Sequence, residues 1–313
     1  MSPLVRDVLG KRLVVDPPPH VVCLGDVMVD VVAHLPGPLA VGSDTPAPIS
    51  LYGGGSAANT ASWLELLGVP TTLIAKVGDD VFGTWSTEQF AWLSKDLAVD
   101  PALTTGTCLV LVGPDGERTM VPDTGANTAL APEDVEPEDF TPGRYLHVSG
   151  YSLFNDARPA ALHALALARH AGMTISVGAA SAGPLESAGA EAFLDWVGSD
   201  LLLFANRDEA RVLTGLSNPR AAATALAARV GRVAVTVGVR GSLWCDGGEV
   251  IYEPTVAVEP VDTTGAGDAY AAAMLWALGQ GAAPPAALQL ANAFGRDACL
   301  HRGGRPSPLQ PLL

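Results

Sequence analysis

Apolar residues follow two different periods along this chain, and the two periods alternate. Residues 20–32 (HVVCLGDVMVDVV) form an apolar run interrupted at Gly25, which predicts a strand buried on both faces. Residues 53–68 switch to helical spacing, and from residue 157 onward helical and strand patterns alternate several times. Such alternation predicts an α/β fold with a largely parallel sheet and helices on both of its faces.

Two segments break this rhythm because they hold strand-like pieces but no helix. One lies between residues 33 and 54, and the other, residues 104–127, reads as a hairpin with GPDGE as its turn. We expect these segments, near residues 34–52 and 104–122, to form one small sheet that acts as a lid over a site. Residues 1–19 end in three prolines and are predicted to be an N-terminal extension to a single domain of residues 20–313.

The composition allows a large core and argues against two kinds of partner. Hydrophobic residues make up 48% of the 313 residues, and the formal net charge is -15. A chain this acidic is a poor candidate for binding nucleic acid or an anionic membrane. Phosphate binding remains open, because backbone amides bind anions whatever the net charge of the chain.

Cysteine usage and the N-terminal sequence point to the cytoplasm. The four widely spaced cysteines form no CxxC pair and are predicted to be buried, reduced thiols: Cys23, Cys108, Cys245 and Cys299. The histidines show no HExxH spacing, which argues against a zinc hydrolase. The first twenty residues lack a signal-peptide apolar core, and the longest apolar helix is too short to span a bilayer. We therefore predict a soluble cytoplasmic protein.

The segment TTGAGD, residues 263–268, places a carboxylate where two glycines open a predicted helix. Glycines permit a tight turn whose amides point into one cavity, and the helix dipole favours negative charge there. Asp268 beside such a cradle could take a proton from an attacking hydroxyl during phosphoryl transfer. Equally, Asp268 could be a plain helix cap, since short glycine motifs are weak evidence.

Other polar motifs also follow predicted strands. Asn206 and Glu209 could serve Mg²⁺ through waters or form a capping box, and locally the capping box is the better interpretation. The turn TVGVRG at residues 236–241 lies where ligands gather in open α/β sheets. GGGSAAN at 53–59 could close on a polar ligand or simply connect a strand to a helix. Asp26 and Asp30 could hold sugar hydroxyls or face solvent.

Taken in order, these motifs resemble the ribokinase-like carbohydrate kinases, also called the PfkB family. The resemblance runs from about His20 to Pro308 and rests on GDVMVD, GGGSAANTA, KVGDDVFG, DTGAN, NRDEA, TVGVRG and DTTGAGDAY. It implies a three-layer α/β sandwich with a mostly parallel central sheet and a small β-sheet lid. It also implies an ATP-dependent kinase that uses Mg²⁺ and phosphorylates a primary hydroxyl of a carbohydrate.

The resemblance implies roles for individual residues. Asp268 would be the catalytic base, with Gly265, Ala266 and Gly267 as the anion hole. The positions that would line the sugar site are Asp26, Asp30, Gly55, Ser56, Asn59 and Asn127. Those that would contact Mg²⁺, phosphate and nucleotide are Asn206, Glu209, Thr236, Gly238, Gly241 and Asn292. Many members of the family bind K⁺, here at Asp262, Thr264, Ala298, Gly303 and Ser307, where it would order the backbone around the anion hole.

Two departures from the family pattern keep alternatives open. Ribokinases proper often carry a lysine at Ser56, and many relatives have aspartate at Gly178. A nucleoside kinase of the same fold shares every motif named above. A non-catalytic sugar-binding protein is the third alternative; Gly178 favours it, whereas the intact GAGD and NRDE motifs argue against it. The edges of the lid sheet could also pair in a homodimer.

Overall fold

The computed structural model describes residues 18–91, 97–114 and 118–306. The predicted N-terminal extension therefore falls outside the described residues, apart from Pro18 and Pro19.

An eight-stranded sheet forms the centre of the molecule, in the spatial order β14-β13-β12-β11-β10-β9-β1-β4. Its strands are β1 (Val21–Leu24), β4 (Thr71–Ile74), β9 (Tyr145–Val148), β10 (Thr174–Gly178), β11 (Leu201–Asn206), β12 (Gly231–Thr236), β13 (Ser242–Cys245) and β14 (Ile251–Glu253). The strands from β4 to β12 run parallel, and β13 and β14 are antiparallel. The predicted, mostly parallel sheet is confirmed.

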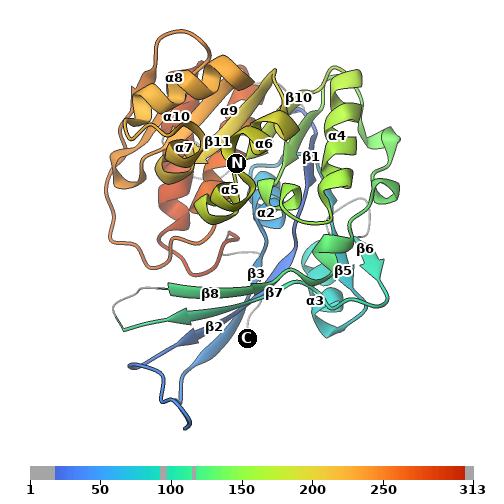
Figure 1. Cartoon of the computed structure of the whole chain (residues 1–313), viewed down its shortest axis with the longest axis vertical. Helices are drawn as coiled ribbons and strands as arrows, with labels where there is room; N and C mark the ends of the chain where they lie inside the picture. The colour runs from blue at the N-terminus through green and yellow to red at the C-terminus, as the bar shows by residue number, and fades with distance from the viewer. Residues whose placement is uncertain (1–17, 92–96, 115–117, 307–313) are drawn as a thin grey trace.

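Helices cover both faces of this sheet (Figure 1). One face packs against α4 (Arg158–His170), α5 (Ala182–Ala188), α6 (Ala190–Val197), α7 (Arg207–Thr214) and α8 (Pro219–Val230). The other packs against α2 (Ser56–Leu66), α9 (Ala266–Gly279) and α10 (Pro284–Ala298). Within β1, Val22 and Leu24 join the first core cluster, while Val21 and Cys23 join the second. This alternation explains why the strands read as continuous apolar runs.

The apolar run at residues 20–32 is two strands rather than the single strand expected. It divides at Gly25 into β1 and β2 (Met28–His34), and the two strands belong to different sheets. Gly25 has a φ of +154°, and a Cβ there would lie 2.5 Å from the Cβ of Ser149. The turn therefore requires glycine. Farther along, β14 ends at Glu253, because the next residue, Pro254, lacks the amide that a ladder needs.

Both strand-only segments contribute to one four-stranded sheet, which we call the small sheet. Its spatial order is β3-β2-β7-β8, with β3 (Ile49–Gly54), β7 (Thr107–Val112) and β8 (Arg118–Asp123) beside β2. The pair β2–β7 is parallel, and the other two pairs are antiparallel. The small sheet lies below the main body in Figure 1, at the edge where β1 ends. Nearby lie α3 (Val81–Gln89) and the short pair β5 (Lys76–Gly78) and β6 (Ala98–Asp100).

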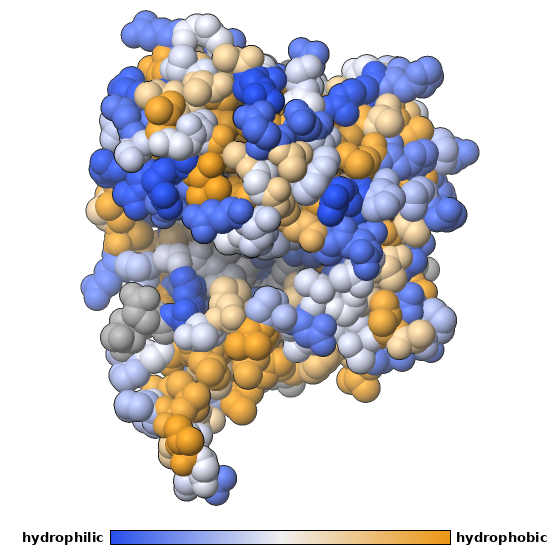
Figure 2. Space-filling model, viewed as in Figure 1, coloured by the Kyte–Doolittle hydropathy of each residue, from blue (hydrophilic) through white to orange (hydrophobic). Residues whose placement is uncertain are grey.

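The two faces of the small sheet differ in character. Alternate side chains, including Asp30, Val32 and His34, line a pocket toward the main body. The opposite face is apolar and open: Leu109 is 41% and Val121 55% exposed, and the two are register partners. Figure 2 shows apolar side chains gathered over the small sheet, below a hollow that separates it from the body. No helix in the described ranges combines the length and apolarity needed to cross a bilayer.

Candidate active site

Asp268 lies in the first turn of α9, and its carboxylate is held by two residues of α2. The Ser56 hydroxyl donates to Oδ1 at 2.7 Å, and the Asn59 amide nitrogen donates to Oδ2 at 2.9 Å. A simple N-cap for its own helix would accept backbone amides instead; the cap position of α9 is Gly265, and it makes no side-chain cap bond. The carboxylate is therefore fixed toward α2 rather than used as a local cap.

The pKa of Asp268 is raised to about 7. Burial is the largest cause, since it disfavours the charged form. The hydrogen bonds from Asn59 and Ser56 oppose the rise, and the nearby charges of Asp26 and Asp30 add to it. A carboxylate with a pKa near neutrality is suited to general-base chemistry, because it can accept a proton and lose it again.

The backbone before Asp268 turns sharply into the helix. Gly265 has a φ of +73°, and a Cβ on it would lie 2.4 Å from the carbonyl oxygen of Gly304. At Gly267 a Cβ would meet nothing within 4 Å. With Ala266, these residues open the N-terminus of a 14-residue helix, where amides without helical partners and the dipole attract anions.

The three glycines at residues 53–55 each make room for a different neighbour. A Cβ on Gly53 would lie 2.2 Å from Nη1 of Arg305, and one on Gly54 would lie 2.5 Å from the Asp30 carboxylate. Gly55 has a φ of +92° and packs against the backbone of Asp26. This glycine run is what lets the start of α2 approach the small sheet so closely.

Asp30 faces the pocket from β2 as a buried carboxylate. Burial raises its pKa to about 6, although the charge of Arg305 opposes the rise; Asp262 and Asp26 add to it. Arg305 is itself buried, donates to the carbonyl of Gly54 at 3.0 Å, and lies 4.6 Å from the centre of the Phe90 ring. No sequence pattern pointed to Arg305, because a single charge in a glycine-rich segment has no periodicity.

The polar side-chain atoms of Asp26 and Asn127 form hydrogen bonds with other residues of the chain. The Asp26 carboxylate accepts the amide of Ser56 at 2.8 Å and the hydroxyl of Ser149 at 2.7 Å. Asn127 accepts the amide of Val27 at 2.8 Å and donates back to its carbonyl at 2.9 Å. These two side chains hold the crossing from β1 to β2 and the start of α2, so they support the residues beside them.

Asn206 and Glu209 form the capping box that their spacing allows. Asn206 caps α7, and Oε2 of Glu209 accepts the Asn206 amide at 2.7 Å. Burial raises the pKa of Glu209 to about 7, opposed by the Asn206 amide and increased by Asp208 and Asp268. Glu209 therefore belongs to the capping box and also lies near enough to Asp268 for the charges of the two groups to interact. Asn206 also pairs in register with Thr236, so the ends of β11 and β12 meet.

The turn after β12 is built on two glycines. Gly238 and Gly241 both have positive φ, and a Cβ on Gly241 would lie 2.1 Å from the carbonyl oxygen of Glu253. Asn292 lies against the next strand, where it accepts the Ser242 hydroxyl at 2.9 Å and donates to Glu253 at 3.1 Å. Both polar atoms of Asn292 thus bind the chain in this structure.

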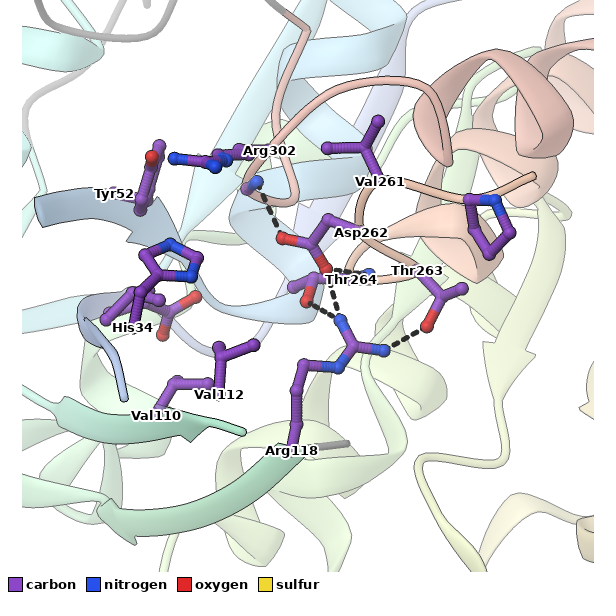
Figure 3. A pocket seen from close by; sticks show the side chains of 14 residues that line it. His34, Tyr52, Val110, Val112, Arg118, Val261, Asp262, Thr263, Thr264 and Arg302 are labelled. Carbon is purple, nitrogen blue, oxygen red and sulfur yellow. Dashed lines mark hydrogen bonds and ion pairs between the residues drawn. The ribbon is translucent and has the colours of Figure 1, made fainter. Parts of the chain in front are cut away.

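A pocket of about 390 Å³ lies between the small sheet and the loop that precedes α9 (Figure 3). Asp30, His34, Tyr52 and Arg118 line it from the small sheet, and residues 260–264 line it from the body. Arg118 reaches across this gap: its guanidinium bonds the Asp262 carboxylate and the Thr263 hydroxyl, and it donates to the Thr264 hydroxyl at 2.8 Å.

The positions predicted for K⁺ fit that ion poorly in this arrangement. Asp262 accepts the amides of Thr264 and Gly303, each at 2.9 Å, as well as the Arg118 guanidinium. Burial raises the pKa of Asp262, but these bonds outweigh that effect and lower it. The carbonyl of Ala298 accepts the His301 amide at 3.3 Å. Ser307 lies outside the described residues.

Tyr151 is a further residue of this region that the sequence did not single out. It follows β9, its hydroxyl bonds Ser181, and the charges of Asp26, Asp268 and Glu209 all raise its pKa, after burial as the largest cause. Its place after a buried parallel strand was the available signal.

Gly178 ends β10, and a Cβ at this position would meet nothing within 4 Å. The space that the aspartate of many relatives would begin to fill is therefore open here.

Comparisons with known proteins place this arrangement in a family. The family model described as pfkB family carbohydrate kinase matches residues 18–310, and the chain belongs to that family. Its members are phosphotransferases with an alcohol group as acceptor. Mouse (Mus musculus) ribokinase is 30% identical over 244 residues, covering 72% of this chain and 71% of its own.

Two solved structures are similar across nearly the whole chain. Adenosine kinase from Sinorhizobium meliloti is 26% identical with a TM-score of 0.79, covering 93% of this chain and 96% of its own. A provisionally named ribokinase II from Escherichia coli, in complex with ATP and Mg²⁺, is 26% identical with a TM-score of 0.81, covering 91% and 94%. The predicted ribokinase-like fold is confirmed.

Gly265→Ala should lower the free energy of unfolding by about 1–3 kcal/mol, because the residue needs positive φ and its methyl group would strike Gly304. Gly267→Ala is the matched control and should change stability by less than about 0.5 kcal/mol, since its Cβ position is open. Urea unfolding of both variants beside the parent measures the difference. Equal destabilisation would show that the tight approach to Gly304 is not required.

Proposed function

We propose that this protein is an ATP-dependent kinase that transfers the γ-phosphoryl group to a primary hydroxyl of a sugar, with Asp268 as the catalytic base. The observation that carries the proposal is the carboxylate of Asp268, with a pKa near 7, held at the glycine-opened N-terminus of α9. A base and an anion cradle at one point suit phosphoryl transfer.

In the proposed step, Asp268 accepts the proton of the acceptor hydroxyl while that oxygen attacks the γ-phosphorus. The bond between the γ-phosphorus and the oxygen bridging to the β-phosphate breaks, and ADP leaves. The amides of Gly265, Ala266 and Gly267 face the charge that develops on the phosphoryl oxygens. Positioning and electrostatics supply most of such catalysis, so the rigid support of Asp268 by Ser56 and Asn59 suits the task.

The acceptor side offers groups suited to hydroxyls. Asp30 presents a buried carboxylate that lines the pocket, and Asn59 has a buried Oδ1 without a hydrogen-bond partner within the described ranges. A buried acceptor without a donor is costly, and a sugar hydroxyl would satisfy it. Asn59 and Ser56 both donate to the Asp268 carboxylate, so this buried oxygen belongs to a side chain that contacts the proposed base. These groups support the proposal that a polyhydroxyl substrate binds here.

Asn206, Glu209, Thr236, Gly238 and Gly241 are the proposed nucleotide side. The Escherichia coli relative binds ATP and Mg²⁺, and the same ligands are proposed here. The buried carboxylate of Glu209 fits a nearby cation, since a positive charge would offset the burial that raises its pKa. Bound Mg²⁺ would supply charge neutralisation on the phosphates. Among the described residues, no group of three His, Cys, Asp or Glu side chains is arranged so that it could hold a metal ion, so phosphates and waters would provide most ligands.

A nucleoside kinase is the second candidate, because it would share the fold and the motifs named above. The similarity to adenosine kinase from Sinorhizobium meliloti agrees with this alternative. A non-catalytic sugar-binding protein is disfavoured by the raised pKa of Asp268, because a carboxylate that only binds hydroxyls gains nothing from it.

We further propose that the small sheet closes as a lid and pairs with a second copy through its apolar outer face. Leu109, Val121 and Ile49 are exposed on that sheet, and contiguous exposed apolar surface marks interaction sites.

A cytoplasmic location is proposed on different grounds: the four cysteines are all free, and three are buried, which suits a reducing compartment.

The central test is a screen of ATP consumption with pentoses, hexoses, phosphosugars and nucleosides, in Mg²⁺ and in EDTA. We expect turnover with a sugar or nucleoside that EDTA abolishes. Asp268→Asn should lower turnover by about 10²–10⁴-fold, the usual contribution of a general base, with little change in substrate affinity. Near-parental turnover in Asp268→Asn would overturn the assignment of the base.

The pH dependence should follow the ionisation of Asp268. Its pKa of about 7 leaves the carboxyl protonated at lower pH and unable to accept a proton, so kcat/KM should rise as pH increases through about 7 and level off above it. Glu209 titrates in the same range, so Glu209→Gln separates the two groups: that variant should retain the step from Asp268. A flat profile between pH 5.5 and 8.5 would contradict the prediction.

Leu109→Glu should convert a dimer into a monomer, because it places a charge in the proposed apolar interface. Leu216→Glu is the matched control, since Leu216 is also 41% exposed but lies after α7 on the main body. Size-exclusion chromatography with light scattering on the parent and both variants gives the masses. A monomeric parent at micromolar concentration, or a dimeric Leu109→Glu, would rule out this interface.

A further inference from the structure

Arg118 joins the small sheet to the loop that leads into the anion hole. It begins β8, and its guanidinium contacts three side chains of that loop: Asp262, Thr263 and Thr264. Its partners lie within six residues of Asp268, on the far side of the turn at Gly265. Arg118 therefore acts on the backbone that shapes the anion hole and does not itself contact Asp268.

The guanidinium stands where a monovalent cation was expected. Asp262 is the carboxylate that the family resemblance assigns to K⁺, and it already accepts Arg118, the Thr264 amide and the Gly303 amide. A second positive charge at the same carboxylate would be repelled by the guanidinium. The side chains of Arg118 and Asp262 are only 26% and 18% exposed, so solvent screens this repulsion less than at an open surface.

The other charged and titratable groups around Arg118 and Asp262 do not require an additional cation to balance their charge. Asp30 feels the charge of Asp262 but has Arg305 beside it, and Arg302 lines the same pocket. Cys299 is neutral, because burial and the charge of Asp262 raise its thiol pKa against the opposing charge of Arg118. Each carboxylate that lines the pocket thus has a guanidinium of its own.

We propose that Arg118 replaces the monovalent cation: its guanidinium neutralises Asp262, orders residues 262–264 and makes the enzyme independent of K⁺. A guanidinium suits this role because its planar fork donates several hydrogen bonds at fixed angles and stays charged. Arg118 is a positioning residue for the anion hole. Because Arg118 belongs to the small sheet, its charge lies next to Asp262 only when that sheet lies against the main body. This inference rests on the proposed kinase function for its activity readout, but not for its binding readout.

The binding test measures thermal unfolding in KCl and in tetramethylammonium chloride at equal ionic strength. The parent should show the same midpoint in both salts. Arg118→Gln removes the charge and should be stabilised by K⁺ over tetramethylammonium by about 2–4 °C, once K⁺ can occupy the vacated position. Arg229→Ala, which removes an equal charge from an ion pair with Glu191 on the main body, should show no K⁺ shift.

The activity test uses the same salts with whichever substrate the screen identifies. Parent turnover should agree within about twofold in K⁺ and tetramethylammonium. Arg118→Gln should lose at least about tenfold in tetramethylammonium and recover most of it in K⁺, while Arg118→Lys should stay close to the parent. These values assume that the loop contributes like other positioning groups.

Two results would overturn the proposal: a parent that K⁺ activates or stabilises, or an Arg118→Gln variant that responds equally to both salts. If Arg118→Gln fails to fold, Arg118→Lys and the salt response of the parent still decide it. Absence of turnover with every substrate would count against the kinase function instead, and the thermal shifts would still test the cation.

Discussion

The structure depends on the contact between the start of α9 and the start of α2, where Ser56 and Asn59 donate to Asp268. A buried carboxylate is costly unless donors hold it, and these donors come from a helix more than two hundred residues earlier in the chain. The two helix starts can meet only because glycines replace side chains around them, at residues 53–55 and again at Gly304. The close packing of the two helix starts and the hydrogen bonding of Asp268 therefore both depend on glycine at these positions.

Several carboxylates of this acidic chain lie around this contact, and they differ in the groups that stabilise them. Asp26 is tied to the amides that open α2, Asp30 has Arg305 beside it, and Asp262 has Arg118. Asp268 and Glu209 have hydrogen-bond donors but no basic partner within the part of the chain that the structure describes, and burial raises the pKa of both to about 7. The groups left without a positive charge are thus those expected to act on a proton or lie near a cation.

The small sheet contributes to both halves of the proposed chemistry. From β2 it carries Asp30 to the acceptor pocket, and from β8 it carries Arg118 to the loop before the anion hole. Because β2 and β8 are joined through β7 in one sheet, the lid closure proposed above would move these two side chains together. Closure over an acceptor would therefore also deliver charge to Asp262. A loop that only excluded water could not provide such coupling.

Local pattern determined much of this protein. The two hydrophobic periods fixed the strands and helices of the main sheet, and the spacing of Asn206 and Glu209 fixed a capping box, since such features involve neighbours within one element. Tertiary packing decided the rest. The run at residues 20–32 divides between two sheets because Gly25 meets Ser149, and Arg118 and Arg305 reach carboxylates far from them in sequence. Periodicity records which face of an element is buried, but contacts across more than a hundred residues are chosen by the packing of the whole fold.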